Sequence, residues 1–218
     1  MKICILNNTE DYHFGSKMVI KTLREQLELR GCELNGSIPR RESWKQHRED
    51  LDKADLLVVN GEGTLHHGRK QELFEVADYY PTALINATID EYILPDEAKQ
   101  FEYVAMRESL SAEYWEDQFG WLPRVVPDLS LMQDVPRFEP IIDVGLFDSV
   151  VNKDWDNGWK SPHGGRFVEK AQKYRRWVTG RFHGACLAII LGKAFSAYRS
   201  NTRKIEGLMM DAGLAADY

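Results

Sequence analysis

Cysteines and long apolar runs are scarce in this chain, and basic residues are outnumbered by acidic ones; each of these features argues against a class of protein. The 218 residues contain 3 cysteines: Cys4, Cys32 and Cys186. They lie in apolar periodic segments, and no two of them have the spacing of metal ligands, so they predict buried, reduced thiols rather than disulfides or a metal centre. Reduced thiols indicate a cytoplasmic protein.

The charge balance disfavours nucleic acid as a partner. Lysine and arginine number 28 against 34 acidic residues, which gives a formal net charge of -6. A general nucleic-acid binder needs clustered basic side chains to displace counterions, whereas a compact site for a small anion does not. A small-anion site therefore remains compatible with this composition.

Long apolar segments are also missing. The longest apolar run, residues 185–191, is far shorter than the ~20 residues of a membrane-spanning helix. Residues 1–6 predict a strand at once, with no secretion signal before it. We therefore expect no membrane span.

Short apolar runs alternate with helical patterns in the first half of the chain, which is typical of a parallel sheet covered by helices. A helix is expected between Ser16 as its N-cap and Gly31 as its C-cap. Ser109 is expected to cap another helix. The predicted strands are residues 3–6, 32–38, 55–59, 82–85, 101–105 and 124–126, and the other predicted helices are 44–51, 71–77, 96–100 and 109–118. This pattern predicts a six-stranded, doubly wound α/β domain.

A proline-rich segment, residues 129–140, predicts a linker, because Pro127, Pro136 and Pro140 bracket it. We expect a domain over residues 1–130 and a smaller one over residues 140–218. The smaller domain should contain strands at 141–146, 176–178 and 194–198, with helices at 166–174, 182–191 and 202–212. The fold class is thus α/β with two Rossmann-like lobes, the C-terminal lobe being reduced.

Polar residues follow the apolar runs, at the strand ends where open parallel sheets bind ligands. Asn8 follows the first run, and Arg107 follows the fifth. After residue 59 come six candidates for a cleft: Asn60, Gly61, Glu62, Gly63, Thr64 and His66. The glycines are equally consistent with a tight turn, and His66 with an ordinary loop residue.

Arg181 and His183 form the most informative constellation. They lie where a predicted strand turns into a helix, and Gly180 and Gly184 flank them and allow close backbone approach. The start of a helix presents N–H groups and the positive end of its dipole to an anion. Arginine adds a fork that matches a carboxylate or phosphate. This arrangement predicts an anion site with an imidazole beside it.

Residues 179–193 read Thr-Gly-Arg-Phe-His-Gly, then an apolar helix, then Gly-Lys. This block closely resembles the C-terminal signature of polysaccharide pyruvyl transferases. Weaker landmarks appear in order before it: an Asn- and Gly-bearing loop at 8–15, Asn-Gly-Glu-Gly-Thr at 60–64, Arg107, and Val-Pro-Asp at 126–128. The resemblance implies a GT-B-like fold, in which two Rossmann-like lobes face a cleft.

The resemblance also implies roles. The donor would be phosphoenolpyruvate and the acceptor a glycan or sugar. Arg181 would hold the donor carboxylate or phosphate with Gly180 and Gly184, His183 would be the catalytic acid, and Arg107 and Lys204 would add contacts to the donor. Glu62 would face the acceptor as a base or hydroxyl ligand.

Two other functions fit the same sequence. One is a GT-B glycosyltransferase that uses a nucleotide sugar, and the other is a non-catalytic sugar- or anion-binding relative. The pyruvyl-transfer scheme needs no cofactor and no metal, since a histidine near its ordinary pKa exchanges protons at neutral pH. A homo-oligomer is also compatible with the small second lobe.

Overall fold

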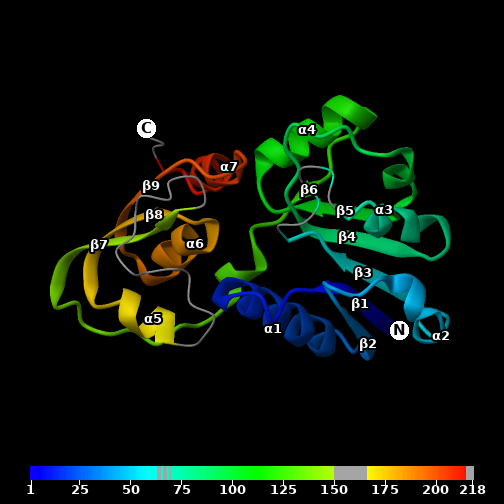
Figure 1. The fold of residues 1–218 in the computed structure, drawn as a ribbon, viewed down its shortest axis with the longest axis horizontal. Helices are drawn as coiled ribbons and strands as arrows, with labels where there is room; N and C mark the ends of the chain where they lie inside the picture. Colours follow the sequence, from blue (N-terminus) through cyan, green and yellow to red (C-terminus); the bar gives the residue numbers. More distant parts are fainter. Residues whose placement is uncertain (63–64, 66–67, 69, 150–165, 215–218) are drawn as a thin grey trace. The chain divides into compact units, whose positions relative to one another are not determined.

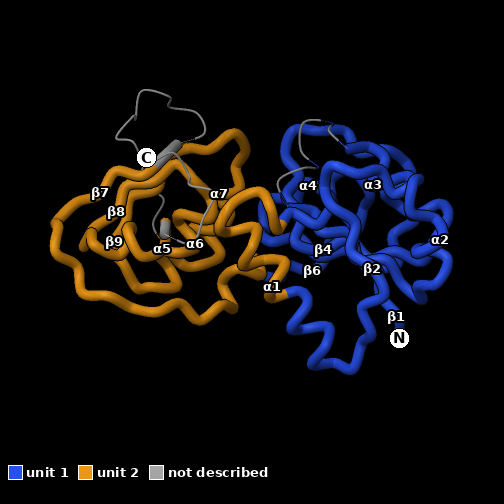
Figure 2. The backbone as a smooth tube through the Cα atoms, turned by 60° about the horizontal axis from the view of Figure 1, so that its bottom comes forward, with its two compact units in different colours: residues 1–9, 23–127 blue, residues 10–22, 128–218 orange. Residues whose placement is uncertain are grey.

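The computed structural model describes residues 1–62, 65, 68, 70–149 and 166–214. The chain divides into two compact units, and each combines two separate segments of the sequence (Figure 2). Unit 1 comprises Met1–Thr9 and Leu23–Pro127, and unit 2 comprises Glu10–Thr22 and Asp128–Tyr218. No feature of the sequence indicates that residues 10–22 group with the second half of the chain.

Unit 1 contains a six-stranded, wholly parallel sheet, which confirms the predicted α/β fold (Figure 1). The strand order is β2-β1-β3-β4-β5-β6. The strands are β1 Lys2–Asn8, β2 Glu33–Pro39, β3 Leu56–Asn60, β4 Thr82–Ala87, β5 Tyr103–Met106 and β6 Arg124–Val125. Because β2 and β3 pair with opposite edges of β1, the topological switch point lies between β1 and β3. Open parallel sheets bind ligands outside the strand ends at that point.

Of the five helices predicted in this part of the chain, two form as regular α-helices and three consist wholly or partly of 3-10 turns. Long α-helices form at α1 Phe14–Leu29, which spans both units, and α4 Ser109–Phe119. The others are α2 Arg48–Leu51 and α3 Glu72–Glu75, with 3-10 turns at Trp44–Gln46, Val76–Asp78 and Asp96–Gln100. The predicted helix at 44–51 is therefore a 3-10 turn followed by a single helical turn. Tertiary packing overrides the helical pattern there, since the buried Trp44 donates from Nε1 to the Glu72 carbonyl at 2.7 Å.

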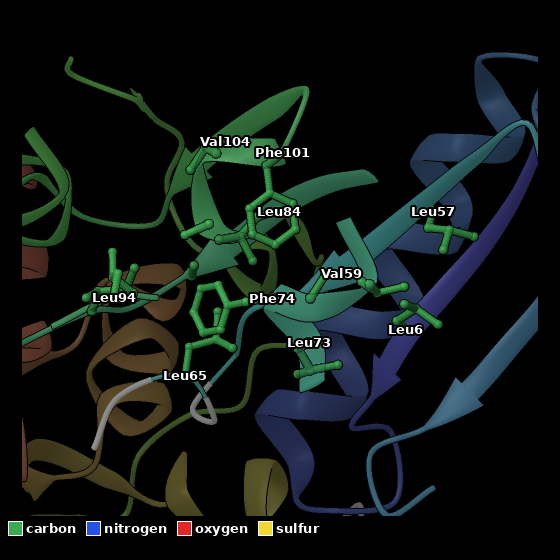
Figure 3. Close-up of a cluster of buried hydrophobic side chains, with 14 of the residues drawn as sticks. Leu6, Leu57, Val59, Leu65, Leu73, Phe74, Leu84, Leu94, Phe101 and Val104 are labelled. Atoms are coloured by element: carbon green, nitrogen blue, oxygen red, sulfur yellow. The ribbon is translucent and has the colours of Figure 1, made fainter. Parts of the chain in front are cut away.

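Alternate residues of the strands build one large core on the α2–α4 face of the sheet. Leu6, Val59 and Leu84 point to this face from three neighbouring strands, and Phe74 and Phe101 cover them with their rings 6.1 Å apart (Figure 3). Side chains on a strand alternate between faces, so the residues between these positions point to the opposite face. The central strands β1, β3 and β4 are buried on both faces, as central parallel strands require, whereas β2 and β6 at the sheet edges are mostly half-buried or exposed.

Two of the predicted helix caps are wrong, for the same reason. The helix α1 begins at Phe14, two residues before Ser16, and His13 caps it by accepting a hydrogen bond at Nδ1 from the Ser16 N–H at 3.1 Å. Similarly, Ser109 is the first residue of α4, and the Glu108 carboxylate accepts from the Ser111 N–H at 2.9 Å. In each case the capping residue is a histidine or a glutamate, neither of which is among the usual N-cap residues. Its side chain accepts a hydrogen bond from the N–H three residues further on.

Unit 2 contains a smaller parallel sheet of three strands in the order β7-β8-β9. The strands are β7 Ile142–Ser149, β8 Tyr174–Gly180 and β9 Ala194–Ala197, and the helices are α5 Arg166–Ala171, α6 Phe182–Leu191 and α7 Lys204–Asp211. The segment predicted as a linker begins with a 3-10 turn, Leu129–Met132. Its Val135 is buried in the core of unit 2, so this segment forms part of the unit.

The start of α1 belongs to unit 2 because its apolar side chains complete the core there. Phe14 stacks on Phe167 of α5 with ring centroids 4.5 Å apart. Phe167 in turn contacts Phe147 of β7, whose ring lies 5.0 Å from that of Trp177 in β8. A three-stranded sheet buries little surface by itself, and the added helical segment enlarges its core.

Within the described ranges, no helix combines the length and the apolar character that a membrane crossing requires.

The cysteines provide a test of the fold. All three are free thiols; Cys4 and Cys186 are buried, and Cys32 is half-buried. Burial, aided by the Asp50 charge, raises the pKa of Cys4 to about 11, so at pH 8 only about one molecule in a thousand carries its thiolate. We expect a thiol reagent at pH 8 to modify one cysteine rapidly, identified as Cys32 by mass spectrometry, and all three in denaturant. Rapid labelling of Cys4 in the native protein would contradict the packing of β1.

Candidate functional site

The predicted site residues fall in two places, the switch point of the sheet in unit 1 and the start of α6 in unit 2. The expected cleft joins residues of both units and remains a prediction. Each place is described below by itself.

A buried polar network occupies the switch point of unit 1. Asn7 donates from Nδ2 to the Asn60 carbonyl at 2.5 Å, and Asn60 donates from Nδ2 to Thr9 Oγ1 at 3.1 Å. The Thr9 hydroxyl donates to Glu62 Oε2 at 2.5 Å. All four residues are at most 4% exposed. These bonds join the ends of β1 and β3 and hold a carboxylate at the position where the fold binds ligands.

The structure brings together three of the residues predicted to follow the first and third strands. Asn60, Gly61 and Glu62 are adjacent, but Asn8 donates to Ser37 Oγ at 2.9 Å on the side of β2. Its neighbours Asn7 and Thr9 enter the network instead. A Cβ on Gly61 would lie 2.7 Å from the Ala87 Cα, so this glycine is required by the close approach of β4. Gly63, Thr64 and His66 lie outside the described residues.

Arg107 directly follows β5 and is 2% exposed. Its Nε donates to Thr88 Oγ1 at 2.5 Å, and its backbone N–H donates to the Ala87 carbonyl at 3.1 Å. The guanidinium is thus fixed beside the end of β4. The predicted contact of Arg107 with a donor anion stays a prediction.

In unit 2, the turn between β8 and α6 has the conformation of a helix N-cap. Arg181 is the N-cap residue, with extended backbone angles (φ -110, ψ 130), and its N–H donates to Thr179 Oγ1 at 3.1 Å. The Arg181 side chain does not cap the helix. A Cβ on Gly184 would overlap Thr179 Oγ1, so a glycine is needed here. The predicted bounds of this helix are confirmed.

His183 lies in the first turn of α6 and faces a buried carboxylate. Its Nε2 is 3.6 Å from Asp128 Oδ1, and the two residues are 7% and 0% exposed. Asp128 Oδ1 also accepts from the Ser130 N–H at 2.9 Å, which orients the carboxylate. The separation of these two atoms exceeds hydrogen-bond range, so the carboxylate faces the imidazole without being bonded to it. Asp128 follows the last strand of the first sheet, so the rule of polar residues after strands does point to it.

The sequence gives no functional prediction for His13, which lies against His183. The centroids of the two rings are 5.0 Å apart, with their planes at 60°. A Cβ on Gly15 would overlap Cβ of His183 and the ring atoms Cγ and Cδ2, so the first turn of α1 packs directly on the imidazole. The sequence feature that indicates this contact is Gly15, because glycine is unfavourable in a helix and Gly15 nevertheless lies in the first turn of α1.

Lys204, the first residue of α7, is 8% exposed and donates from Nζ to Asn201 Oδ1 at 2.6 Å. The ammonium therefore holds the loop that precedes α7. Its predicted role in donor binding stays a prediction.

Comparison with known proteins shows the fold and leaves the function open. No protein-family model and no curated protein matches the chain. A solved structure of an uncharacterized protein from Klebsiella pneumoniae is similar in fold, with a TM-score of 0.68, 15% identity, and coverage of 97% of this chain and 88% of that chain.

Two more distant structures are an alpha-glucosyltransferase in complex with UDP and DNA, and the periplasmic binding protein of an arabinose transporter from Shewanella. Their TM-scores are 0.42 and 0.41, at 11% and 10% identity; they cover 87% and 98% of this chain, which spans 59% and 70% of theirs. At these scores neither supports an inference about this chain.

The contact between Gly184 and Thr179 provides a test of the turn at Arg181. We expect Gly184→Ala to lower the free energy of unfolding by about 1–3 kcal/mol through overpacking. Thr179→Ala removes the overlapping oxygen and leaves the nearest Thr179 atom, Cβ, at 3.3 Å. The cost of Gly184→Ala measured by urea unfolding should therefore be smaller in the Thr179→Ala background. Equal costs in both backgrounds would contradict this packing.

Proposed function

We propose that the chain is a transferase of the polysaccharide pyruvyl transferase type, with its two units acting as GT-B-like lobes. It would transfer a pyruvyl group from phosphoenolpyruvate to a pair of sugar hydroxyls. The observation that carries the proposal is the pair of His183 and Asp128 at the start of α6, directly beside Arg181. This pair places an imidazole beside a buried carboxylate where an anion is expected to bind.

The donor carries a carboxylate and a phosphate, and unit 2 offers positive groups of the matching kind. Arg181 supplies a guanidinium fork, and the first turn of α6, which includes Gly184, supplies backbone N–H groups and a positive dipole end. Two contacts fix the conformation of this turn: Gly184 packs closely on Thr179, and the Arg181 N–H donates a hydrogen bond to Thr179 Oγ1. Lys204, with Arg107 from unit 1, supplies further positive charge in the proposal.

His183 is the proton donor in the proposed reaction. In this scheme its imidazolium transfers a proton to the methylene carbon of the enol, which becomes the methyl group. One sugar hydroxyl forms a C–O bond to the central carbon and gives up its proton. The C–O bond to phosphate then breaks, and the second hydroxyl forms the other ketal bond. One of the two hydroxyl protons returns to His183 and replaces the proton that it donated. The other hydroxyl proton leaves with inorganic phosphate.

The polar network of unit 1 is suited to the acceptor. Glu62 already accepts a hydrogen bond from the Thr9 hydroxyl, and a sugar hydroxyl offers the same donor group. A carboxylate at a strand end both orients a hydroxyl and takes its proton as it attacks. Glu62 and Asn60 are therefore the proposed acceptor ligands.

Ligand-dependent stability separates this function from its alternatives. At equal concentration we expect phosphoenolpyruvate to raise the melting temperature more than UDP-glucose does, because a ligand that binds only the native state stabilises it by mass action. A larger shift with the nucleotide sugar would favour a glycosyltransferase. Binding of phosphoenolpyruvate without phosphate release, over a panel of glycan acceptors, would favour a non-catalytic relative.

If these roles are correct, one substitution should impair donor binding and another should impair turnover. Arg181→Ala should raise the dissociation constant of phosphoenolpyruvate about 30-fold to 1000-fold, through loss of a charge-assisted contact. His183→Gln should bind the donor nearly normally and lower turnover roughly 100-fold to 10000-fold, the range for a lost general acid. Calorimetric titration gives the first quantity, and phosphate release with a glycan acceptor gives the second. Full turnover by His183→Gln would leave His183 as a structural residue.

A further inference from the structure

The parallel sheet of unit 2 exposes apolar side chains on one of its faces. Ile142, Val144 and Leu146 are alternate residues of β7, so they point to the same face, and they are 44%, 46% and 42% exposed. Phe147 points to the opposite face, where it is buried in the core. Among the described strands, β7 is an edge strand that pairs with β8 (Figure 1). Because parallel sheets are normally covered on both faces, we expect the exposed face of β7 to contact a partner.

Two more exposed apolar residues precede β7 and extend this surface. Ile141 is 77% exposed, and Phe138 is 50% exposed. The Ile141 N–H donates to the Lys173 carbonyl at 2.8 Å, and the Phe138 N–H donates to Gln172 Oε1 at 2.9 Å. These bonds hold both residues beside the segment that joins α5 to β8. The apolar side chains therefore project from a backbone that hydrogen bonds fix in place.

Basic side chains lie next to these apolar residues. Lys173, Arg175 and Arg176 are exposed at the start of β8, and Arg176 is the cross-strand partner of Val144. The Arg176 guanidinium donates to the Asp143 carboxylate, and this bond, together with the charges of Arg176 and Arg175, lowers the pKa of Asp143. Asp143 therefore remains ionised at neutral pH and offsets one of the positive charges.

The charge of this region is opposite in sign to that of the chain. Residues 137–146 and 167–176 contain five lysine or arginine residues and three acidic residues, a net charge of +2, whereas the formal net charge of the whole chain is -6. The basic residues are Arg137, Lys170, Lys173, Arg175 and Arg176, and the acidic residues are Glu139, Asp143 and Glu169. We call the five exposed apolar residues, Phe138, Ile141, Ile142, Val144 and Leu146, together with the five basic ones, the apolar–basic patch.

We propose that the apolar–basic patch binds the surface of an anionic lipid bilayer. The isoleucines and Phe138 enter the boundary between headgroups and acyl chains, and the lysine and arginine side chains contact the lipid phosphates. A second copy of the chain fits less well, because it would bring two positively charged patches together. Nucleic acid would engage the basic side chains and leave the apolar ones exposed. The inference is independent of the proposed function, since the patch adjoins the start of β8 and Arg181 follows its end.

The experiment is co-sedimentation of the full chain with two kinds of vesicle. One kind is phosphatidylcholine alone, and the other is phosphatidylcholine mixed with phosphatidylglycerol. We expect the chain to bind the anionic vesicles roughly 10-fold or more tightly than the neutral ones, and added salt to weaken this binding. Failure to bind anionic vesicles, or equal affinity for both kinds, would overturn the proposal.

The contribution of charge is tested by a double substitution with a matched control. Lys173→Gln combined with Arg175→Gln should weaken binding to anionic vesicles about 5-fold to 30-fold. Arg41→Gln combined with Lys53→Gln removes the same charge at exposed positions of unit 1 and should bind like the wild type. Equal weakening in both double variants would assign binding to overall charge and refute a role for the patch.

The apolar contribution is tested in the same way. Ile141→Ser should weaken vesicle binding about 3-fold to 10-fold, because less apolar surface enters the bilayer. Its melting temperature should stay near that of the wild type, since the Ile141 side chain is largely exposed. Ile93→Ser is the control, because Ile93 is 85% exposed in unit 1. Wild-type affinity in Ile141→Ser would contradict insertion of the patch.

Two measurements that need no folded charge variant complete the test. Anionic vesicles should slow hydrogen exchange of the wild-type amides in residues 138–146, and neutral vesicles should not; unchanged exchange would overturn the proposal. Sedimentation equilibrium without lipid should show no dimer that depends on the patch. A dimer that Ile141→Ser dissociates would identify a second copy as the partner and would also overturn the proposal.

Discussion

The organisation of unit 2 depends on the contact between the backbone of Gly15 and the imidazole of His183. Any side chain at residue 15 would occupy the volume of the ring. Because the contact is so close, the first turn of α1 has a fixed place in unit 2, and Phe14 reaches Phe167 from that place. The position of the ring follows from this packing and from the nearby Asp128 together.

The switch point of unit 1 shows how a buried polar cluster is tolerated. Burying a carboxylate and several amides without partners costs several kcal/mol, but here the Thr9 hydroxyl donates to Glu62 and the two asparagines bond to each other's strands. Asn7 has a positive φ of 58, a conformation that asparagine adopts more readily than most residues. The strand end thus turns inward and presents polar atoms where a regular strand would continue.

The fold was largely predictable from the sequence, and the composition of the site was only partly so. Short apolar runs correctly predicted the central strands β1, β3 and β4, because these strands are buried on both faces. The motif at Arg181 predicted the helix α6, but His13 was missed, since nothing local relates residue 13 to residue 183. The sequence predicts Asn8 as a cleft residue, whereas Asn7 and Thr9 enter the network; which of these neighbours points there depends on a register that the sequence alone leaves undetermined.

The two-segment construction of unit 2 has a consequence for biosynthesis. During translation, Phe14 and Met18 emerge early, but the aromatic residues that cover them in the core, among them Phe167 and Trp177, are made more than a hundred residues later. At synthesis rates of about 5–20 residues per second, this apolar helix start waits several seconds or longer without its partners. Such an interval is long enough for a chaperone to bind it. The contact between His13 and His183 therefore cannot form until residue 183 has been made, when every strand of the sheet in unit 1 has already been synthesised.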